Sequence, residues 1–320
     1  MEESVRIPEE VLKKAQDEIR SIVDNIETVI VGKHASVELV VLALLARGHV
    51  LIEDVPGVGK TSLVSAVAKS VDCGFKRIQF TPDLMPSDVT GFSVYNQGTG
   101  EFEFRPGAVM SNIVLADEIN RASAKTQAAL LEAMEEKQVT VDSHTYNLEE
   151  PFMVLATQNP LESFGTYPLP DAQIDRFLIK LSMGYPSVEE ERKIIHNGKA
   201  SKKKISPVIS KQDVVALSNL AERVRVDESI ERYIVEIVTA TRSHKNISLG
   251  VSPRGSIALH GASKVLALMR GRSYVIPDDI KYLAPSILAH RLSLSNEAKL
   301  NHVDPKKLIA EIVDSIVVPM

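Results

Sequence analysis

The stretch Asp54-Val-Pro-Gly-Val-Gly-Lys-Thr61 comes directly after the apolar run of residues 49–53 and directly before residues 62–71, which have helical character. This order of strand, glycine-rich loop and helix is typical of a loop that wraps a phosphate chain. The glycines let backbone N–H groups turn inward, and the start of the helix adds a partial positive charge. Lys60 adds a full charge, and the hydroxyl of Thr61 can bind Mg²⁺. The stretch therefore predicts a nucleotide-binding α/β fold.

Seven residues in and directly after this stretch are expected to contact the nucleotide: Pro56, Gly57, Val58, Gly59, Lys60, Thr61 and Ser62. Asp54 stands where such loops usually begin with a glycine, a position that demands less of the backbone than Gly59 does. The alternative is an ordinary glycine turn that binds nothing. The lysine and threonine at their required positions favour the phosphate loop.

Further short apolar runs alternate with helical segments along the first part of the chain. The runs cover residues 77–80, 112–117, 152–157 and 177–181. This alternation predicts a parallel sheet covered by helices. Two stretches interrupt it, residues 81–107 and residues 137–148, and the second has alternating residues around Asp142-Ser143-His144 that predict a β-hairpin. Both are expected to be insertions into the sheet scaffold.

After Pro186 the pattern changes to helices only. Apolar positions recur at helical spacing after Asp227, which is a suitable N-cap, and in residues 253–270, 277–291 and 305–317. The chain also opens with an amphipathic helix, residues 8–25. We therefore expect two domains, an α/β nucleotide-binding core in residues 1–190 and a helical domain in residues 205–320.

The composition excludes several classes of protein. The chain has 320 residues, of which 44% are apolar, and a net charge of −5. Its longest apolar run, residues 39–46, is far shorter than the roughly 20 residues of a membrane span, so an integral membrane protein is not expected. The acidic start of the sequence lacks the pattern of a secretory signal, which makes the cytoplasm the expected location. The charge balance also disfavours stable nucleic-acid binding.

Two features have an ordinary and a functional reading. The basic patch at residues 199–204 fits a solvated linker, with contact to nucleic acid as the alternative. Cys73 is the single cysteine, so it cannot form an internal disulfide and is expected to be a small apolar side chain. No His, Cys or carboxylate cluster has the spacing that would hold a transition metal.

Two adjacent acids end the predicted strand of residues 113–117. Asp117 and Glu118 are expected at the carboxyl edge of the sheet, beside the phosphate loop. There Asp117 can hold Mg²⁺, and Glu118 can polarise the attacking water. Such a pair alone is more often a helix cap with solvated charges. With a phosphate loop upstream, the catalytic role is favoured over the helix cap.

Three further polar residues can contact a nucleotide. Asn159 follows the strand that ends at Thr157 and can orient the attacking water, although Asn159-Pro160 also fits an ordinary turn. Arg176 and Arg254 each offer a planar guanidinium, which can stabilise the charge on a γ-phosphate. For a single arginine, a structural ion pair is the more ordinary reading.

The order of these motifs resembles the AAA+ ATPases, and their wording is similar to the MoxR family. The resemblance covers nearly the whole chain and rests on Val55-Pro-Gly-Val-Gly-Lys-Thr61, Asp117-Glu-Ile-Asn-Arg-Ala122, Lys125-Thr-Gln-Ala-Ala-Leu-Leu-Glu-Ala-Met134, Ala156-Thr-Gln-Asn-Pro160 and Leu169-Pro-Asp-Ala-Gln-Ile-Asp-Arg-Phe177. It implies a P-loop NTPase core with a C-terminal all-helical lid, and ATP and Mg²⁺ as cofactors. Residues 80–107 would then be an insertion within the second helix, and residues 137–148 a hairpin before the first sensor.

The resemblance also implies roles for single residues. Arg176 would be the finger that reaches into a neighbouring subunit, Asn159 the first sensor and Arg254 the second sensor on the lid. Val31-Gly32 would lie near the adenine. Whether Arg254 and Arg121 serve the nucleotide of their own subunit or of a neighbour stays open. Related proteins further imply a homo-oligomer, a hexamer, that remodels proteins in a chaperone-like way, with partners that carry a von Willebrand factor A domain.

The leading hypothesis is thus a Mg²⁺-dependent ATPase in a ring, in which hydrolysis moves the lid against the core and reshapes a bound protein. One alternative is a scaffold that assembles on ATP with little turnover, against which Glu118 and Asn159 argue. Another is a chelatase-like or DNA-dependent motor, and the acidic net charge weighs against its DNA version.

Overall fold

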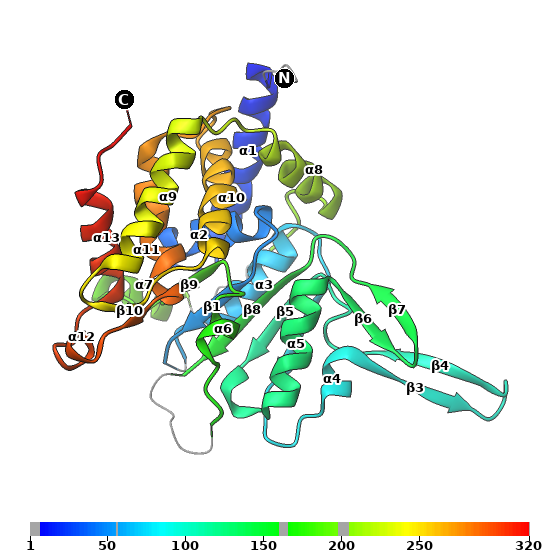
Figure 1. Cartoon of the computed structure of the whole chain (residues 1–320). Helices are drawn as coiled ribbons and strands as arrows, with labels where there is room; N and C mark the ends of the chain where they lie inside the picture. The colour runs from blue at the N-terminus through cyan, green and yellow to red at the C-terminus, as the bar shows by residue number, and fades with distance from the viewer. Residues whose placement is uncertain (1–6, 56, 160–165, 198–204, 320) are drawn as a thin grey trace.

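The computed structural model describes residues 7–55, 57–159, 166–197 and 205–319, which Figure 1 shows as a cartoon. In chain order its helices are α1 (Glu9–Glu27), α2 (His34–Leu45), α3 (Lys60–Ser70), α4 (Pro86–Thr90), α5 (Ala124–Glu136), α6 (Asp171–Ile174), α7 (Val188–Asn197), α8 (Lys211–Glu222), α9 (Glu228–Ser243), α10 (Pro253–Met269), α11 (Pro277–Leu288), α12 (Asn296–Leu300) and α13 (Pro305–Ser315). The helices expected from the sequence all form, with ends shifted by a few residues. The longest shift is in α11, whose last turn, Ala289–Arg291, is a 3-10 helix.

The central sheet consists of the five runs that were predicted to be strands. They are β1 (Val50–Glu53), β2 (Phe75–Gln79), β5 (Ile113–Asp117), β8 (Met153–Gln158) and β9 (Ile179–Leu181). Their order is β2-β5-β8-β1-β9, and every neighbouring pair is parallel. The loops that follow the strands therefore gather at one edge of the sheet, the carboxyl edge, and those that precede them gather at the amino edge.

Both faces of the central strands β5, β8 and β1 are buried. Ile113 and Leu115 of β5 belong to the apolar cluster that includes α1, α2 and α3, whereas Val114 and Ala116 belong to the cluster that includes α5. Successive residues of a strand point to opposite faces, so a strand between two helical layers must be apolar throughout. This explains why the sequence shows continuous apolar runs here.

Two antiparallel hairpins project from the core. After α4 the chain forms β3 (Gly91–Asn96) and β4 (Glu101–Pro106), and after α5 it forms β6 (Gln138–Val141) and β7 (His144–Asn147), the hairpin expected from the sequence. Asp142 and Ser143 make the tight turn between β6 and β7 with positive φ of 47° and 67°. The ring of Phe104 on β4 stacks on Tyr146 of β7 at a centroid distance of 4.0 Å. The hairpins thus lean on each other, on the side of the molecule away from α9–α13 (Figure 1).

Among its described residues, the region after Pro186 is helical except for two short strands. β10 (Ile247–Leu249) and β11 (Ser293–Leu294) pair antiparallel, so the expectation of helices only is wrong for these two segments. Strands of two or three residues are too short to produce an alternating pattern that could be read from a sequence. The basic patch expected at residues 199–204 lies outside the described residues.

The helical region shares its apolar interior with the core. α1 and α2 pack against α10, and α2 also packs against α8. Buried side chains from both regions, among them Ile19, Leu42 and Leu266, form one cluster. The buried guanidinium of Arg291, which follows α11, donates to the carbonyl of Phe177 in the core at 2.8 Å. The boundary between residues 190 and 205 stays a prediction.

Candidate functional site

The phosphate loop connects β1 to α3, as predicted. Gly57 and Gly59 adopt positive φ of 89° and 95°, which side chains rarely allow, and a Cβ at either position would meet no atom within 4 Å. Open space therefore lies beside both glycines. Lys60 and Thr61 form the first turn of α3, where the helix presents its partial positive charge. The Nζ of Lys60 donates to the carbonyl of Asp54 at 3.0 Å.

Three other residues were expected to contact the nucleotide: Ser62, Val58 and Pro56. Ser62 also lies in the first turn of α3. Val58 is partly buried and packs against the larger apolar cluster, which anchors the loop to the core. Pro56 lies outside the described residues.

Asp54 holds the start of the loop, and this explains why no glycine stands there. Its carboxylate is buried, and Oδ2 accepts hydrogen bonds from the hydroxyl of Ser182 at 3.3 Å and from the backbone N–H groups of Met183 and Gly184, the latter at 2.9 Å. Oδ1 accepts from the N–H of Val55 at 3.2 Å. A glycine could make none of these contacts. Asp54 therefore ties the phosphate loop to the segment that follows β9.

Asp117 and Glu118 lie at the carboxyl end of β5, as predicted. The hydroxyl of Thr157, on the neighbouring strand β8, donates to Oδ1 of Asp117 at 2.6 Å and accepts from the N–H of Glu118 at 2.9 Å. Glu118 adopts a positive φ of 56°, uncommon for a residue other than glycine. The threonine thus fixes both acids relative to β8, which separates β5 from β1.

Three partners of these acids, Thr157, Arg77 and Gln79, were missed in the sequence. Arg77 pairs with Oδ2 of Asp117 at 2.6 Å, and Gln79 donates to Oε2 of Glu118 at 2.7 Å. The same Oε2 accepts from Nη1 of Arg121 at 3.0 Å, so Arg121 contacts a residue of its own chain. Polar residues at alternate positions of β2 were a visible signal for Arg77 and Gln79. That Arg77 and Gln79 contact the two acids became clear only from the strand pairing, which places Gln79 opposite Asp117.

Asn159 follows β8, the strand that pairs with β1, and the Val31-Gly32 segment lies against α7. Asn159 is buried and follows Gln158, which pairs in register with Glu53 at the end of β1. Gly32 has a positive φ of 73°, and a Cβ there would collide with the side chain of Glu190 on α7. This segment therefore lies against the chain that follows β9, the same chain that Asp54 holds.

Arg176 and Arg254 lie at the opposite, amino edge of the sheet. Two residues after Arg176, the N–H of Leu178 donates to the carbonyl of His49, which immediately precedes β1. The phosphate loop follows the other end of β1, so the length of this four-residue strand, roughly 13 Å, lies between them. Glu135 at the end of α5 pairs with Nη2 of Arg176 at 2.9 Å and with Nη2 of Arg254. The structure brings the two arginines together and keeps both away from the loop of their own chain.

A cavity of about 260 Å³ adjoins these arginines and carries an excess of positive charge. Its charged lining residues are Arg47, Arg176, Arg254, Arg291, Glu135 and Asp175. Asp175 accepts a hydrogen bond from the hydroxyl of Ser252 at 3.1 Å and pairs with Arg291. The Asp-Arg-Phe motif is therefore held by contacts from the helical region.

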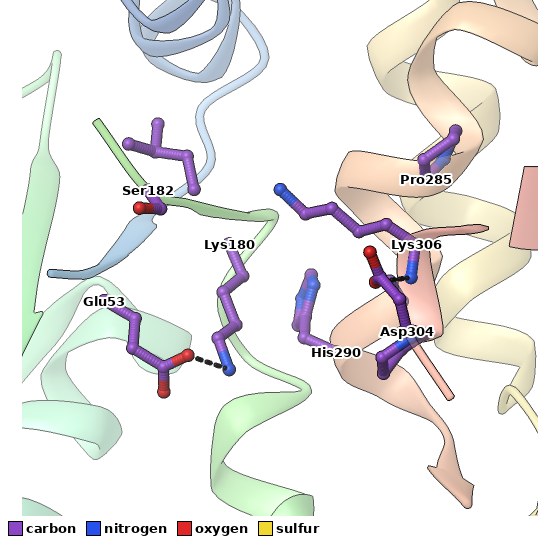
Figure 2. Close-up of a pocket in the computed structure, with 10 residues that line it drawn as sticks. Glu53, Lys180, Ser182, Pro285, His290, Asp304 and Lys306 are labelled. Carbon is purple, nitrogen blue, oxygen red and sulfur yellow. Dashed lines mark hydrogen bonds and ion pairs between the residues drawn. The ribbon is translucent and has the colours of Figure 1, made fainter. Parts of the chain in front are cut away.

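A second cavity of about 260 Å³ lies between the carboxyl ends of β1 and β9 and the helices α11 and α13. Figure 2 shows Glu53 and Lys180, paired at 2.9 Å, on one side and His290 and Lys306 on the other. Burial lowers the pKa of His290 to about 3, so its ring is neutral at pH 7. This cavity lies between the core and the lid. It adjoins the phosphate loop, because its lining residue Glu53 immediately precedes Asp54.

The described residues lack three further features: a metal-binding cluster, a reactive cysteine and a membrane-spanning helix. They contain no group of three or more His, Cys, Asp or Glu side chains that could hold a metal ion. Cys73 is half-buried, and burial raises the pKa of its thiol to about 12, which keeps it protonated. Within the same residues no helix is long and apolar enough to cross a membrane.

The phosphate loop, two acids and an asparagine at the carboxyl edge of this sheet, together with a helical lid, define an ATPase of the P-loop class. Family models agree with this assignment. Residues 49–179 match the ATPase family associated with various cellular activities (AAA), and residues 239–312 match the AAA lid domain.

Similar proteins narrow the class further. The uncharacterized protein YeaC of Bacillus subtilis is 58% identical over 93% of this chain and 94% of its own length. Chaperone MoxR1 of Mycobacterium tuberculosis is 43% identical over 92% of this chain and 81% of its own length. A crystal structure from Cytophaga hutchinsonii, of a protein assigned only provisionally as an ATPase, superposes with a TM-score of 0.91 at 40% identity and covers 98% of each chain. The chain belongs to the MoxR family of AAA+ ATPases.

Proposed function

We propose that this ATPase works as a ring of identical subunits, in which the ATP at the phosphate loop of one subunit is hydrolysed with the help of Arg176 of the next. One observation carries the proposal. Lys60 and Glu118 lie at the carboxyl edge of the sheet, and Arg176 lies at its amino edge, where it pairs with Glu135. A single subunit cannot assemble these groups around one γ-phosphate, whereas two subunits in a head-to-tail contact can.

The residues of the carboxyl edge would share the work as follows. The backbone from Pro56 to Gly59 and the ammonium of Lys60 bind the phosphates, supported by Val58 and Ser62, and Val31-Gly32 borders the adenine. Glu118 accepts a hydrogen bond from the attacking water and takes up its proton, while Asn159 orients that water. Gln79 and Arg121 both donate to Oε2 of Glu118, so the attacking water would bind to Oε1 or displace one of them.

The oxygen ligands at this edge suit Mg²⁺. The hydroxyl of Thr61 and the carboxylate of Asp117 are hard donors, which this ion prefers. Both oxygens of Asp117 already accept hydrogen bonds, from Thr157 and from Arg77, so Asp117 would hold the ion through water unless Arg77 moves. When bound, Mg²⁺ neutralises phosphate charge that would otherwise oppose attack.

The work done by hydrolysis would be the remodelling of a protein. The name of the 43% identical relative, Chaperone MoxR1, supports this proposal. So do Phe92, Tyr95 and Phe102 on the projecting β3–β4 hairpin, which are 47%, 52% and 74% exposed, because exposed apolar side chains of this size favour protein contacts. A hexamer, a partner with a von Willebrand factor A domain and a cytoplasmic location remain parts of the proposal that rest on the family alone.

The test is the steady-state ATPase rate per subunit as a function of protein concentration, for the native chain and for Arg176→Ala. A shared site predicts that the native rate rises with concentration and that Arg176→Ala loses on the order of 10³-fold in kcat while it still binds ATP. Arg232→Ala is a matched control, because within the described part of the chain Arg232 makes only an exposed pair with Glu228 on α9. A rate that is flat with concentration, together with a fully active Arg176→Ala, would show that each subunit is self-sufficient.

A further inference from the structure

One carboxylate, that of Glu135, binds both arginines at the amino edge of the sheet. We infer that Glu135 is a positioning residue, which holds Arg176 of the core and Arg254 of the lid together as one unit for the γ-phosphate of the neighbouring subunit's ATP. This inference rests on the proposed function, because it assumes that Arg176 acts on a neighbour's nucleotide.

The geometry lets Glu135 position the arginines without using up their hydrogen-bonding capacity. Oε2 binds Nη2 of Arg176 at 2.9 Å, and Oε1 binds Nη2 of Arg254. Among the described residues, neither guanidinium has a second partner, so each keeps its other N–H groups for a ligand. The side chains of Arg176 and Arg254 remain 31% and 45% exposed, which leaves them accessible to another subunit.

The electrostatics of the cavity explain why a carboxylate is needed there. Four arginines and two acids line it, and one of the acids, Asp175, is already paired with Arg291. Two guanidinium groups that approach one phosphate repel each other. A negative charge between them offsets part of this repulsion, so that Arg176 and Arg254 can be held close together before the phosphate arrives.

Glu135 is itself held by a rigid support. It lies in the last turn of α5, where the preceding residue, Met134, accepts a hydrogen bond from Nε2 of His49 at 3.1 Å. Nδ1 of His49 in turn accepts from the backbone N–H of Val154 on β8 at 3.0 Å. The end of α5 is therefore fixed to the sheet. Through Glu135 it holds Arg254 of the lid and Arg176 of the core in a fixed position relative to the sheet.

The test uses mixed rings, in which the finger and the hydrolysing site are on different chains. Arg176→Ala keeps an intact phosphate loop but lacks the finger, and Glu118→Gln keeps the finger but cannot hydrolyse ATP. Neither is active alone, and mixing them restores ATPase activity if the site is shared. Glu135→Gln is then added to the Glu118→Gln chain, which only donates the finger. Glu132→Gln, on the exposed face one turn earlier in α5, is the matched control.

The inference predicts that Glu118→Gln/Glu135→Gln restores the activity of Arg176→Ala at least tenfold less well than Glu118→Gln does, because a small displacement of a catalytic group costs about 10²-fold. The Glu132→Gln control should restore it fully. When Glu135→Gln is placed instead on the Arg176→Ala chain, activity should be unaffected, since that chain uses only its phosphate loop.

Three results would overturn the inference. If the Glu135→Gln chain donates its finger as well as the control does, Glu135 has no positioning role although the shared site stands. If Glu135→Gln abolishes activity on either chain, its role is in folding rather than in positioning. If Glu118→Gln does not restore Arg176→Ala at all, the shared site itself is wrong, and the role of Glu135 fails with it.

Discussion

The carboxylate of Asp54 joins the phosphate loop to the segment that continues from β9 toward the lid. Among the described residues, Gly57 and Gly59 have backbone angles that require glycine in this loop, whereas Asp54 does not have a positive φ. The buried N–H of Met183 and the partly buried N–H of Gly184 depend on its Oδ2. A side chain that looks like a departure from the usual loop is therefore a structural requirement of this fold.

We predict that Asp54→Gly, which restores the usual glycine, lowers the free energy of unfolding by about 1–3 kcal/mol, because buried donors lose their acceptor. The KM for ATP should rise, since the loop loses its attachment to the chain after β9. Urea unfolding and steady-state kinetics measure the two effects. Ser182→Ala, which removes only the bond of 3.3 Å, should cost less than about 1 kcal/mol. An Asp54→Gly variant with native stability and native KM would contradict this role.

The roles of single residues could be predicted only in part. The glycines, Lys60, Asp117 and Glu118 follow from the order of strand, loop and helix, because that order alone places them at one edge of a sheet. Gln79 could not be predicted as a partner of Glu118, since the partnership depends on β2 lying beside β5. The pairing of Arg254 with Glu135 depends on where the lid rests, which no local pattern encodes.

At the scale of elements, the end of α5 is fixed to the sheet by a buried histidine. His49 bridges Met134 of α5 and Val154 of β8 through its two ring nitrogens, which requires the neutral ring with the proton on Nε2. Burial is the main cause that lowers the pKa of His49 from 6.5 to about 4. The position of Glu135 thus depends on an uncharged imidazole.

This histidine predicts how stability depends on pH. The folded pKa lies below the unfolded one, so the contribution of His49 is fully present above pH 6.5 and is lost as the pH falls from 6.5 toward 4. Between pH 7.5 and pH 5 the loss amounts to about 2 kcal/mol. His49→Gln should therefore be less stable at pH 7.5 but should lose about 2 kcal/mol less over this interval, as measured by urea unfolding at both pH values. An equal decline in both proteins would show that His49 does not titrate in this way.

The two hairpins give a second prediction at this scale. The stack of Phe104 on Tyr146 is the contact through which β4 leans on β7, and such a pair contributes about 0.5–1.5 kcal/mol. Tyr146→Ala should speed hydrogen exchange in β3 and β4 by up to about tenfold, because the β3–β4 hairpin opens more easily. Tyr95→Ala is the control. It removes the exposed contact with Phe102 within the β3–β4 hairpin, where the ring centroids are 5.4 Å apart, and should leave the attachment to β7 intact. Unchanged exchange in Tyr146→Ala would mean that this stack does not hold the two hairpins together.

At the scale of the whole molecule, the lid and the core are less separate than the sequence suggests. The change from alternating strands and helices to helices after Pro186 predicts two units, since a pattern along the chain shows where elements change but not which faces pack together. In the structure one apolar cluster includes residues of α1, α2, α10 and α11. A large swing of the lid would expose this cluster to water. We therefore expect hydrolysis to shift subunits against each other more than it moves the lid within one subunit.

The shared cluster predicts a single cooperative unfolding transition for the monomer in calorimetry, with equal calorimetric and van't Hoff enthalpies. Arg291→Ala should shift that transition as a whole, by about 3–5 kcal/mol, because it leaves the buried contacts to Asp175 and Phe177 without a partner. Arg232→Ala, at an exposed pair, should cost less than about 1 kcal/mol. Two separate transitions, of which Arg291→Ala shifts only one, would show instead that lid and core fold independently. A lid that swings on hydrolysis would then be the better account of how this ATPase does its work.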